Sequence, residues 1–115
     1  MDDMEKFGTI VDCRIDEISS IGEARVRTTG KIVNVDDIGI FIIEGEKGSK
    51  LVCMPSPDMK EKPSVSDLVL ITGKAVKSDG SVELRIDDIQ KINENDLNNF
   101  NKYLKIRREL LEHGS

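Results

Sequence analysis

Aromatic residues are scarce in this 115-residue chain, which has three Phe, one Tyr and no Trp, together 3% of the sequence. A hydrophobic core must therefore be built from Ile, Val and Leu. No apolar run approaches the roughly 20 residues needed to span a bilayer. The first residues also lack the basic and apolar regions of a signal peptide. We expect a soluble, intracellular, single-domain protein.

Histidine and cysteine are equally rare. The one His, His113, lies near the end of the sequence, so no His-based catalytic triad or relay is predicted within the folded body. Cys13 and Cys53 lack the paired spacing of a metal site. In an intracellular chain such isolated thiols are mostly reduced packing residues, and a disulfide is the alternative.

Other candidate catalytic patterns are incomplete. Asp36-Asp37 is expected in a turn and Asp87-Asp88 at a strand end, and nothing in their spacing brings the two pairs together as a metal site. The Thr-Gly-Lys sequences at 29–31 and 72–74 lack the upstream glycine and the following helix of a phosphate-binding loop. We predict no enzyme activity, no metal and no cofactor.

The formal net charge of −5 is unevenly distributed. Residues 1–23 carry two basic and seven acidic side chains, residues 24–93 carry eleven of each sign, and residues 94–115 carry four of each. The excess of acidic charge therefore lies entirely at the start of the chain. We predict an acidic arm (1–23) that packs on the body, a balanced body (24–93), and a C-terminal helical segment (94–112). A balanced body can still present a basic stripe to nucleic acid.

Two strand-like runs each contain a central glycine. Residues 24–35 are rich in β-branched side chains and are interrupted by Gly30, and residues 68–76 repeat the pattern around Gly73. Glycine within a strand usually marks a bend, a bulge or a close backbone approach. Two bent strands predict a small barrel.

Three further strands are predicted at 38–44, 50–54 and 82–86. The three prolines between 55 and 63 exclude a central strand there and make one long connection. The order is three antiparallel strands, a long connection and a hairpin, which is typical of a five-stranded oligonucleotide/oligosaccharide-binding (OB) barrel. An SH3-like barrel is the alternative. The predicted fold class is mainly β, an OB-fold barrel with a C-terminal α-helix.

Three stretches resemble the middle and small subunits of replication protein A, the archaeal versions most of all, and the related telomere-capping CST subunits. These stretches are residues 26–35, 67–74 and 84–93, and the resemblance covers roughly residues 20–112. The resemblance implies an OB barrel followed by a helix that joins partner helices in a bundle. It also implies the cytoplasm of an archaeon or the nucleus of a eukaryote.

The C-terminal helix predicted at 97–111 has more apolar surface than one docking face requires. Its apolar residues form two adjacent stripes that span about 180° of the helix surface, whereas a single docked face needs little more than 100°. Arg107 also falls inside this apolar arc, which favours an intermolecular role over docking on the barrel alone. The predicted partner-binding residues are Leu97, Phe100, Leu104 and Leu111 in one stripe and Tyr103, Ile106 and Leu110 in the other.

A single-stranded nucleic acid would need cations along a groove and rings on which bases stack. Alternation along the first bent strand places its cations on one face, provided that no bulge at Gly30 changes the phase. Phe41 is the only ring in the barrel body, and its alternative place is the core. The predicted nucleic-acid-binding residues are Arg25, Arg27, Lys31, Phe41, Lys50, Lys74, Lys77 and Arg85.

Together these features predict a single-stranded-DNA-binding subunit of a replication protein A-like complex in DNA replication or repair. Its expected partners are larger OB-fold subunits, bound through the C-terminal helix, and single-stranded DNA, bound weakly. With only one ring, the DNA contact should be salt-sensitive and without sequence readout. The alternative is a structural OB-fold adaptor that binds only proteins.

Overall fold

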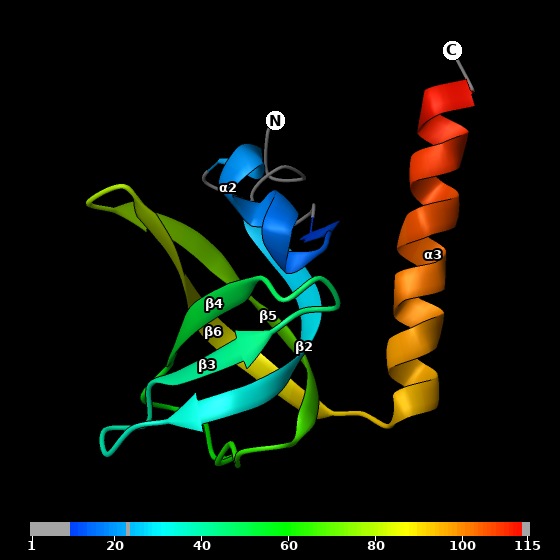
Figure 1. Cartoon of the computed structure of the whole chain (residues 1–115). Helices are drawn as coiled ribbons and strands as arrows, with labels where there is room; N and C mark the ends of the chain where they lie inside the picture. Colours follow the sequence, from blue (N-terminus) through cyan, green and yellow to red (C-terminus); the bar gives the residue numbers. More distant parts are fainter. Residues whose placement is uncertain (1–9, 23, 114–115) are drawn as a thin grey trace.

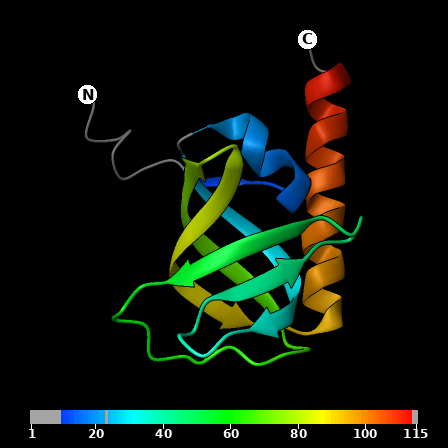
Figure 2. The ribbon, with the colours of Figure 1, turned by 60° about the vertical axis from the view of Figure 1, so that its left-hand side comes forward.

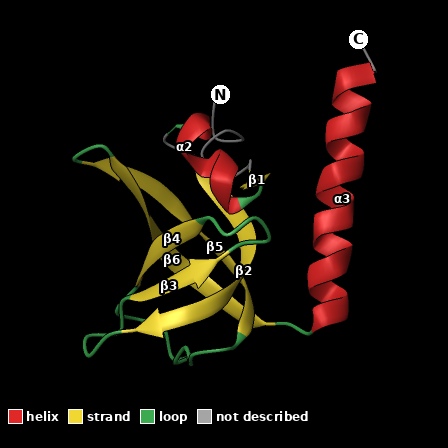
Figure 3. Cartoon of the chain, viewed as in Figure 1, coloured by secondary structure: helices red, strands yellow, loops and turns green. Residues whose placement is uncertain are grey.

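The computed structural model describes residues 10–22 and 24–113 (Figure 1). It consists of a small barrel, a short N-terminal segment above it and a long helix beside it (Figure 3). In chain order the elements are β1 (Ile10–Asp12), the 3-10 helix η1 (Ile15–Glu17), α2 (Ile18–Ile21), β2 (Arg25–Val35), β3 (Phe41–Glu44), β4 (Lys50–Pro55), β5 (Leu68–Ser78), β6 (Ser81–Lys91) and α3 (Glu94–His113).

Five strands close the barrel. The sheet order is β1-β2-β3-β4-β6-β5, and an antiparallel pairing of β2 with β5 joins its ends. Strands β4 and β6 are parallel, and β1 adds a short parallel strand outside the barrel on β2. The predicted OB-fold barrel with a C-terminal helix is thereby confirmed.

Aliphatic side chains fill the barrel, as the scarcity of rings predicts. Inward-facing positions alternate along the strands, and Val26, Ile32, Ile43 and Ile71 are fully buried. Phe41 is the one ring among these buried side chains and has none of its surface exposed.

The central glycine of β5 lies where two strands approach too closely for a side chain. A Cβ at Gly73 would lie 2.1 Å from the Arg85 carbonyl oxygen of β6, inside any acceptable contact. A Cβ at Gly30 would lie 3.1 Å from Ile43 and from the Glu44 carbonyl oxygen, which is tight but not prohibitive. Both glycines allow close packing, and Gly73 is the more restricted.

The largest differences from the predicted strand boundaries are at the start of β3 and the end of β6. Strand β3 begins at Phe41 rather than at residue 38, because the Asp36 carboxylate accepts hydrogen bonds from the Ile38 and Ile40 N–H groups and closes a tight loop. Strand β6 continues through Asp87-Asp88 to Lys91, so this acidic pair lies inside a strand and not at its end. A register shift beside Gly73 places Asp87 opposite no residue of β5.

Helix α3 begins at Glu94, earlier than the predicted residue 97, and its N-cap is Asn93. The Asn93 side-chain oxygen accepts a hydrogen bond from Asp96 N–H at 2.8 Å, and the Asp96 carboxylate accepts one from Asn93 N–H at 3.3 Å. This reciprocal arrangement is a capping box. It satisfies N–H groups that the first turn of a helix leaves without partners.

The described part of the acidic arm, residues 10–22, packs on the barrel. Ile15 and Ile18 are buried in the core cluster, at the short helical turn formed by η1 and α2. Residues 1–9 and 23 of the predicted arm lie outside the described residues. Within residues 10–22 and 24–113, no helix is long and apolar enough to cross a membrane.

Both cysteines are buried and free, in agreement with the predicted packing role. Burial, followed by the nearby carboxylates of Glu17 and Asp12, raises the pKa of the Cys13 thiol to about 12. Burial also raises the pKa of Cys53. Because the thiolate is the reactive form, both thiols are chemically inert at neutral pH.

Candidate partner and nucleic-acid interfaces

Helix α3 runs beside the barrel and lies close to β2 and β5 (Figure 2). Leu97, Phe100 and Leu104 are half-buried there, at the lower and middle turns of the helix. Polar contacts hold the same side: Asn101 donates a hydrogen bond to Glu46, and Arg108 forms an ion pair with Glu17. This side corresponds to the first predicted stripe, except that Leu111 at the far end of the helix is 70% exposed.

The second predicted stripe of α3 is largely exposed to solvent. Tyr103, Ile106 and Leu110 are 47%, 48% and 67% exposed, and we call these three residues the outer stripe. They are among the few large hydrophobic side chains of the described residues that stay in solvent. Contiguous exposed apolar patches are typical of surfaces that bind proteins, ligands or membranes. That it binds a partner stays a prediction.

Arg107 has an internal role, which corrects the argument drawn from its position in the apolar arc. Its guanidinium donates a hydrogen bond to the Asp12 carbonyl oxygen of β1 at 3.3 Å. Arg107 therefore ties α3 to the N-terminal segment. The evidence for a second surface on α3 comes from the exposure of the outer stripe instead.

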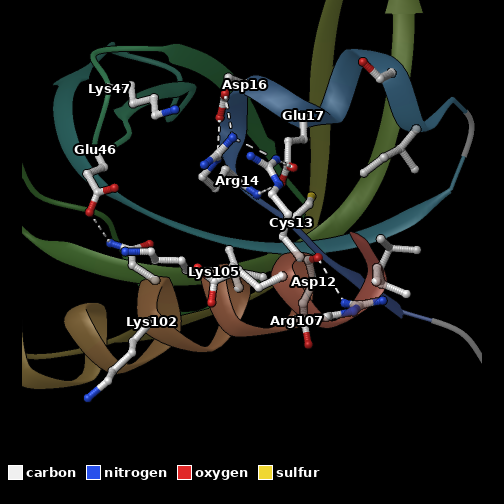
Figure 4. Close-up of a pocket in the computed structure, with 18 of the residues that line it drawn as sticks. Asp12, Cys13, Arg14, Asp16, Glu17, Glu46, Lys47, Lys102, Lys105 and Arg107 are labelled. Carbon is white, nitrogen blue, oxygen red and sulfur yellow. Dashed lines mark hydrogen bonds and ion pairs between the residues drawn. The ribbon is translucent and has the colours of Figure 1, made fainter. Parts of the chain in front are cut away.

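A cleft of about 1150 Å³ lies between α3, the N-terminal segment and the β3–β4 loop (Figure 4). Its charged groups are of both signs and several are already paired: Arg14 with Asp16 at 3.2 Å, Arg108 with Glu17 and Asn101 with Glu46. The pocket therefore offers no concentrated charge of one sign to a ligand. The contacts of Arg108 and Asn101 that hold α3 cross this cleft.

Three of the predicted cations are adjacent on the outer surface of the sheet. Arg25 pairs in register with Lys74, and Lys74 pairs with Arg85, so the three side chains lie side by side across β2, β5 and β6. All three are exposed. We call them the cationic row. Asp87 forms an ion pair with Arg25 at 2.8 Å, so one of the three charges is partly neutralised.

The other cations of β2 and β4 do not extend this row. Arg27 is bound to the Asp12 carboxylate at 2.7 and 3.1 Å, and this hydrogen bond raises the pKa of Arg27 above its ordinary value. Lys31 and Lys50 each pair in register with Glu44, at the other end of β2 from Arg25. No bulge at Gly30 changes the phase, since the register shift of β2 falls between Ile32 and Asn34.

Two predicted nucleic-acid contacts lie elsewhere. Lys77 is exposed, but it lies three residues after Lys74 and therefore on the opposite face of β5. This is the face on which Ala75 is buried. Lys77 reaches solvent because the β5–β6 hairpin extends past the rest of the barrel (Figure 1). Phe41 is fully buried, so its prediction as a stacking ring is wrong and its alternative place in the core is correct. The reason is alternation: Phe41 and Ile43 face inward together.

The sequence reasoning missed an aliphatic patch on β3 and β4. Because Phe41, Ile43, Leu51 and Cys53 face inward, the intervening Ile42, Val52 and Met54 face outward and are only half-buried. In OB folds the second and third barrel strands, here β3 and β4, form the usual ligand face. The described residues place no aromatic ring on this face. Alternation in 41–44 and 50–54 was the signal that could have identified it.

No protein-family model matches the chain, and no curated protein matches it. Solved structures do. The Stn1–Ten1 complex of S. pombe superposes with a TM-score of 0.70 and 15% identity, over 90% of this chain and 95% of that chain. The chain has the fold of these subunits. Replication protein A of U. maydis bound to single-stranded DNA gives a TM-score of 0.68 with 17% identity, over 88% of this chain and 91% of that chain.

The OB fold is also shared with a protein of unassigned role. The hypothetical protein ygiW of E. coli superposes with a TM-score of 0.60 and 19% identity, over 74% of this chain and 99% of that chain. The comparisons with Stn1–Ten1 and replication protein A show that the chain resembles these proteins in its fold.

Proposed function

We propose that this chain is a small OB-fold subunit of a replication protein A-like complex, in which α3 provides assembly and the barrel makes a weak contact with single-stranded DNA. Its partners are other OB-fold subunits. The observation that carries the proposal is the exposed outer stripe on a helix already docked through its other side. The fold shared with subunits of Stn1–Ten1 and replication protein A supports it.

The assembly role follows from the two-sided use of α3. Asn101, Arg107 and Arg108 bind α3 to the β3–β4 loop and the N-terminal segment, so the outer stripe is presented in a fixed orientation. Complete burial of an exposed aliphatic side chain contributes about 1.5–3 kcal/mol. Tyr103 and Ile106 are already about half covered, so the outer stripe supplies only part of the free energy that holding a partner helix requires.

We expect loss of assembly when the outer stripe is made acidic. With Ile106→Glu and Leu110→Glu combined, retention of an OB-fold partner should fall at least about 100-fold, because both side chains are buried in the complex. The measurement is a pull-down with the full chain from cells of its source, quantified by mass spectrometry. Lys105→Glu, on the flank that borders the cleft, is the control and should retain the partner. Equal retention by the stripe variant and the control would contradict the proposal.

The DNA contact is assigned to the cationic row. Its three neighbouring side chains present a local positive charge that the Asp87 carboxylate offsets only in part. Backbone phosphates are recognised by such charges without reading sequence. With three phosphates contacted, the logarithm of the affinity should fall with the logarithm of salt concentration with a slope of about −2.

We expect the combined substitutions Arg25→Glu, Lys74→Glu and Arg85→Glu to weaken binding of single-stranded DNA at least about tenfold, measured by fluorescence anisotropy at low salt. The control reverses Lys47, Lys60 and Lys62, three exposed loop lysines, and so changes the net charge by the same amount. An equal loss in the control would assign binding to net charge and not to the row.

A protein-only adaptor is the second candidate function. The aliphatic patch of Ile42, Val52 and Met54 favours it, since this outward surface offers apolar contact in place of stacking rings. In that case the wild-type chain shows no DNA binding at low salt, alone or with its partner, while assembly through α3 is retained.

A further inference from the structure

The charges beside the outer stripe are arranged so that the stripe can bind a copy of itself. Tyr103, Ile106 and Leu110 follow one another at spacings of three and four, which is the apolar repeat of a coiled coil. Lys102 and Glu109 flank them, seven residues apart and therefore on the same side of the stripe. Both are exposed, and neither forms a hydrogen bond or ion pair within the described part of the chain.

We propose that two copies of this chain pair through their outer stripes with the α3 helices antiparallel. Self-pairing rests on the proposed function, because it uses the same surface of α3. The second copy occupies that surface when no other subunit is bound. The pairing is isologous, since the same residues contribute from both copies.

In an antiparallel pair related by a twofold axis, residues on the same flank of each stripe meet. The register that packs Tyr103 against Ile106 of the second copy also places Lys102 beside Glu109 of the second copy. The symmetry repeats this opposite-charge contact, so one pairing produces two. In the same register, Asn99 of one copy packs against Leu110 of the other copy, in the layers next to those of Tyr103 and Ile106.

A parallel pair has the opposite electrostatics. In parallel coiled coils a flank residue meets the residue five positions later on the other flank of the partner helix. Lys102 would then face Arg107 of the second copy, twice, and like charges destabilise such contacts. The sequence of charges therefore selects the antiparallel orientation.

The barrel leaves room for this pairing. Leu97, Phe100 and Leu104, in the adjacent stripe of α3, are half-buried, whereas the outer stripe is about half exposed or more. Lys102 and Glu109 border the cleft, and Figure 4 shows the Lys102 side chain extending out of it. A second α3 can therefore lie along the outer stripe without displacing the first from its own barrel.

Sedimentation equilibrium of the full chain at low salt tests the proposal. We expect a concentration-dependent dimer. Lys102→Glu and Glu109→Lys, made singly, should each raise its dissociation constant about tenfold, because each turns two attractions into two repulsions. The two substitutions together restore opposite charges and should bring the constant back to within about threefold of wild type. Lys105→Glu is the control and should leave it unchanged.

Cross-linking tests the orientation. A bismaleimide should join Asn99→Cys chains to Leu110→Cys chains when the two are mixed, and should not join Asn99→Cys chains to one another. The buried Cys13 and Cys53 do not interfere. Cross-linking of Asn99→Cys alone would indicate a parallel pair and overturn the proposal.

The remaining outcomes separate the two proposals. A wild-type chain that is monomeric at all concentrations overturns self-pairing, and so does a double charge reversal that fails to restore the dimer. If that monomer still captures an OB-fold partner through the outer stripe, the proposed function stands alone. If neither a dimer nor a captured partner depends on the outer stripe, both proposals fail.

Discussion

Replacing Gly73 with alanine is expected to lower the free energy of unfolding by about 3 kcal/mol or more. The added Cβ would lie 2.1 Å from the Arg85 carbonyl oxygen and 2.8 Å from the carbonyl carbon, so it meets backbone that no side-chain rotation can move. Strands β5 and β6 must separate at the point where the barrel bends. Urea unfolding followed by circular dichroism measures the loss.

Gly30 supplies the matched control, because it lies at the corresponding Thr-Gly-Lys sequence of β2. Its added Cβ would meet Ile43 and the Glu44 carbonyl at 3.1 Å, which a shift of a few tenths of an ångström relieves. We expect Gly30→Ala to cost about 1 kcal/mol. Equal losses at the two positions would contradict the close approach of β5 and β6.

Replacing Phe41 with alanine is expected to cost about 3–5 kcal/mol, since it removes a fully buried ring from the small aliphatic core and leaves a cavity. A domain of this size has a total stability of about 5–15 kcal/mol, so the variant is close to unfolding. Thermal or urea unfolding measures the change. Few other side chains of the barrel contribute as much volume.

Phe41→Leu separates the core role of this residue from a nucleic-acid role. Leucine keeps most of the volume, and the expected loss of stability is only about 1 kcal/mol. Binding of single-stranded DNA should be unchanged, because the ring never reaches the surface. A folded Phe41→Leu chain that has lost DNA binding would show that the ring stacks on bases after all.

The strands and the closure of the barrel were predictable from local pattern. Alternation between core and surface has a period of two along a strand, and the glycines of β2 and β5 mark the bends. The two Thr-Gly-Lys sequences looked equivalent, yet an added Cβ would lie 2.1 Å from a backbone carbonyl oxygen at Gly73 and 3.1 Å from one at Gly30. Which neighbour a glycine approaches depends on strands distant in sequence, and no local pattern contains that information.

The cations also show which features follow from local pattern and which depend on residues distant in the sequence. Alternation correctly put Arg25 and Arg27 on one face of β2, but Arg27 is held by Asp12 and Arg25 by Asp87. These carboxylates are 15 and 62 residues away from their partners in the chain. The cationic row likewise exists only because strand pairing brings Lys74 and Arg85 beside Arg25.

Helix α3 shows most directly what the sequence determined and what the tertiary structure determined. The sequence alone determined that the helix has two apolar stripes, because a period of 3.6 residues fixes which side chains share a side. Only the tertiary structure decided how the helix is docked, through the contacts of Arg107 and Arg108 with the N-terminal segment. A helix cannot bury both stripes against one small barrel, and the one left in solvent is the candidate interface.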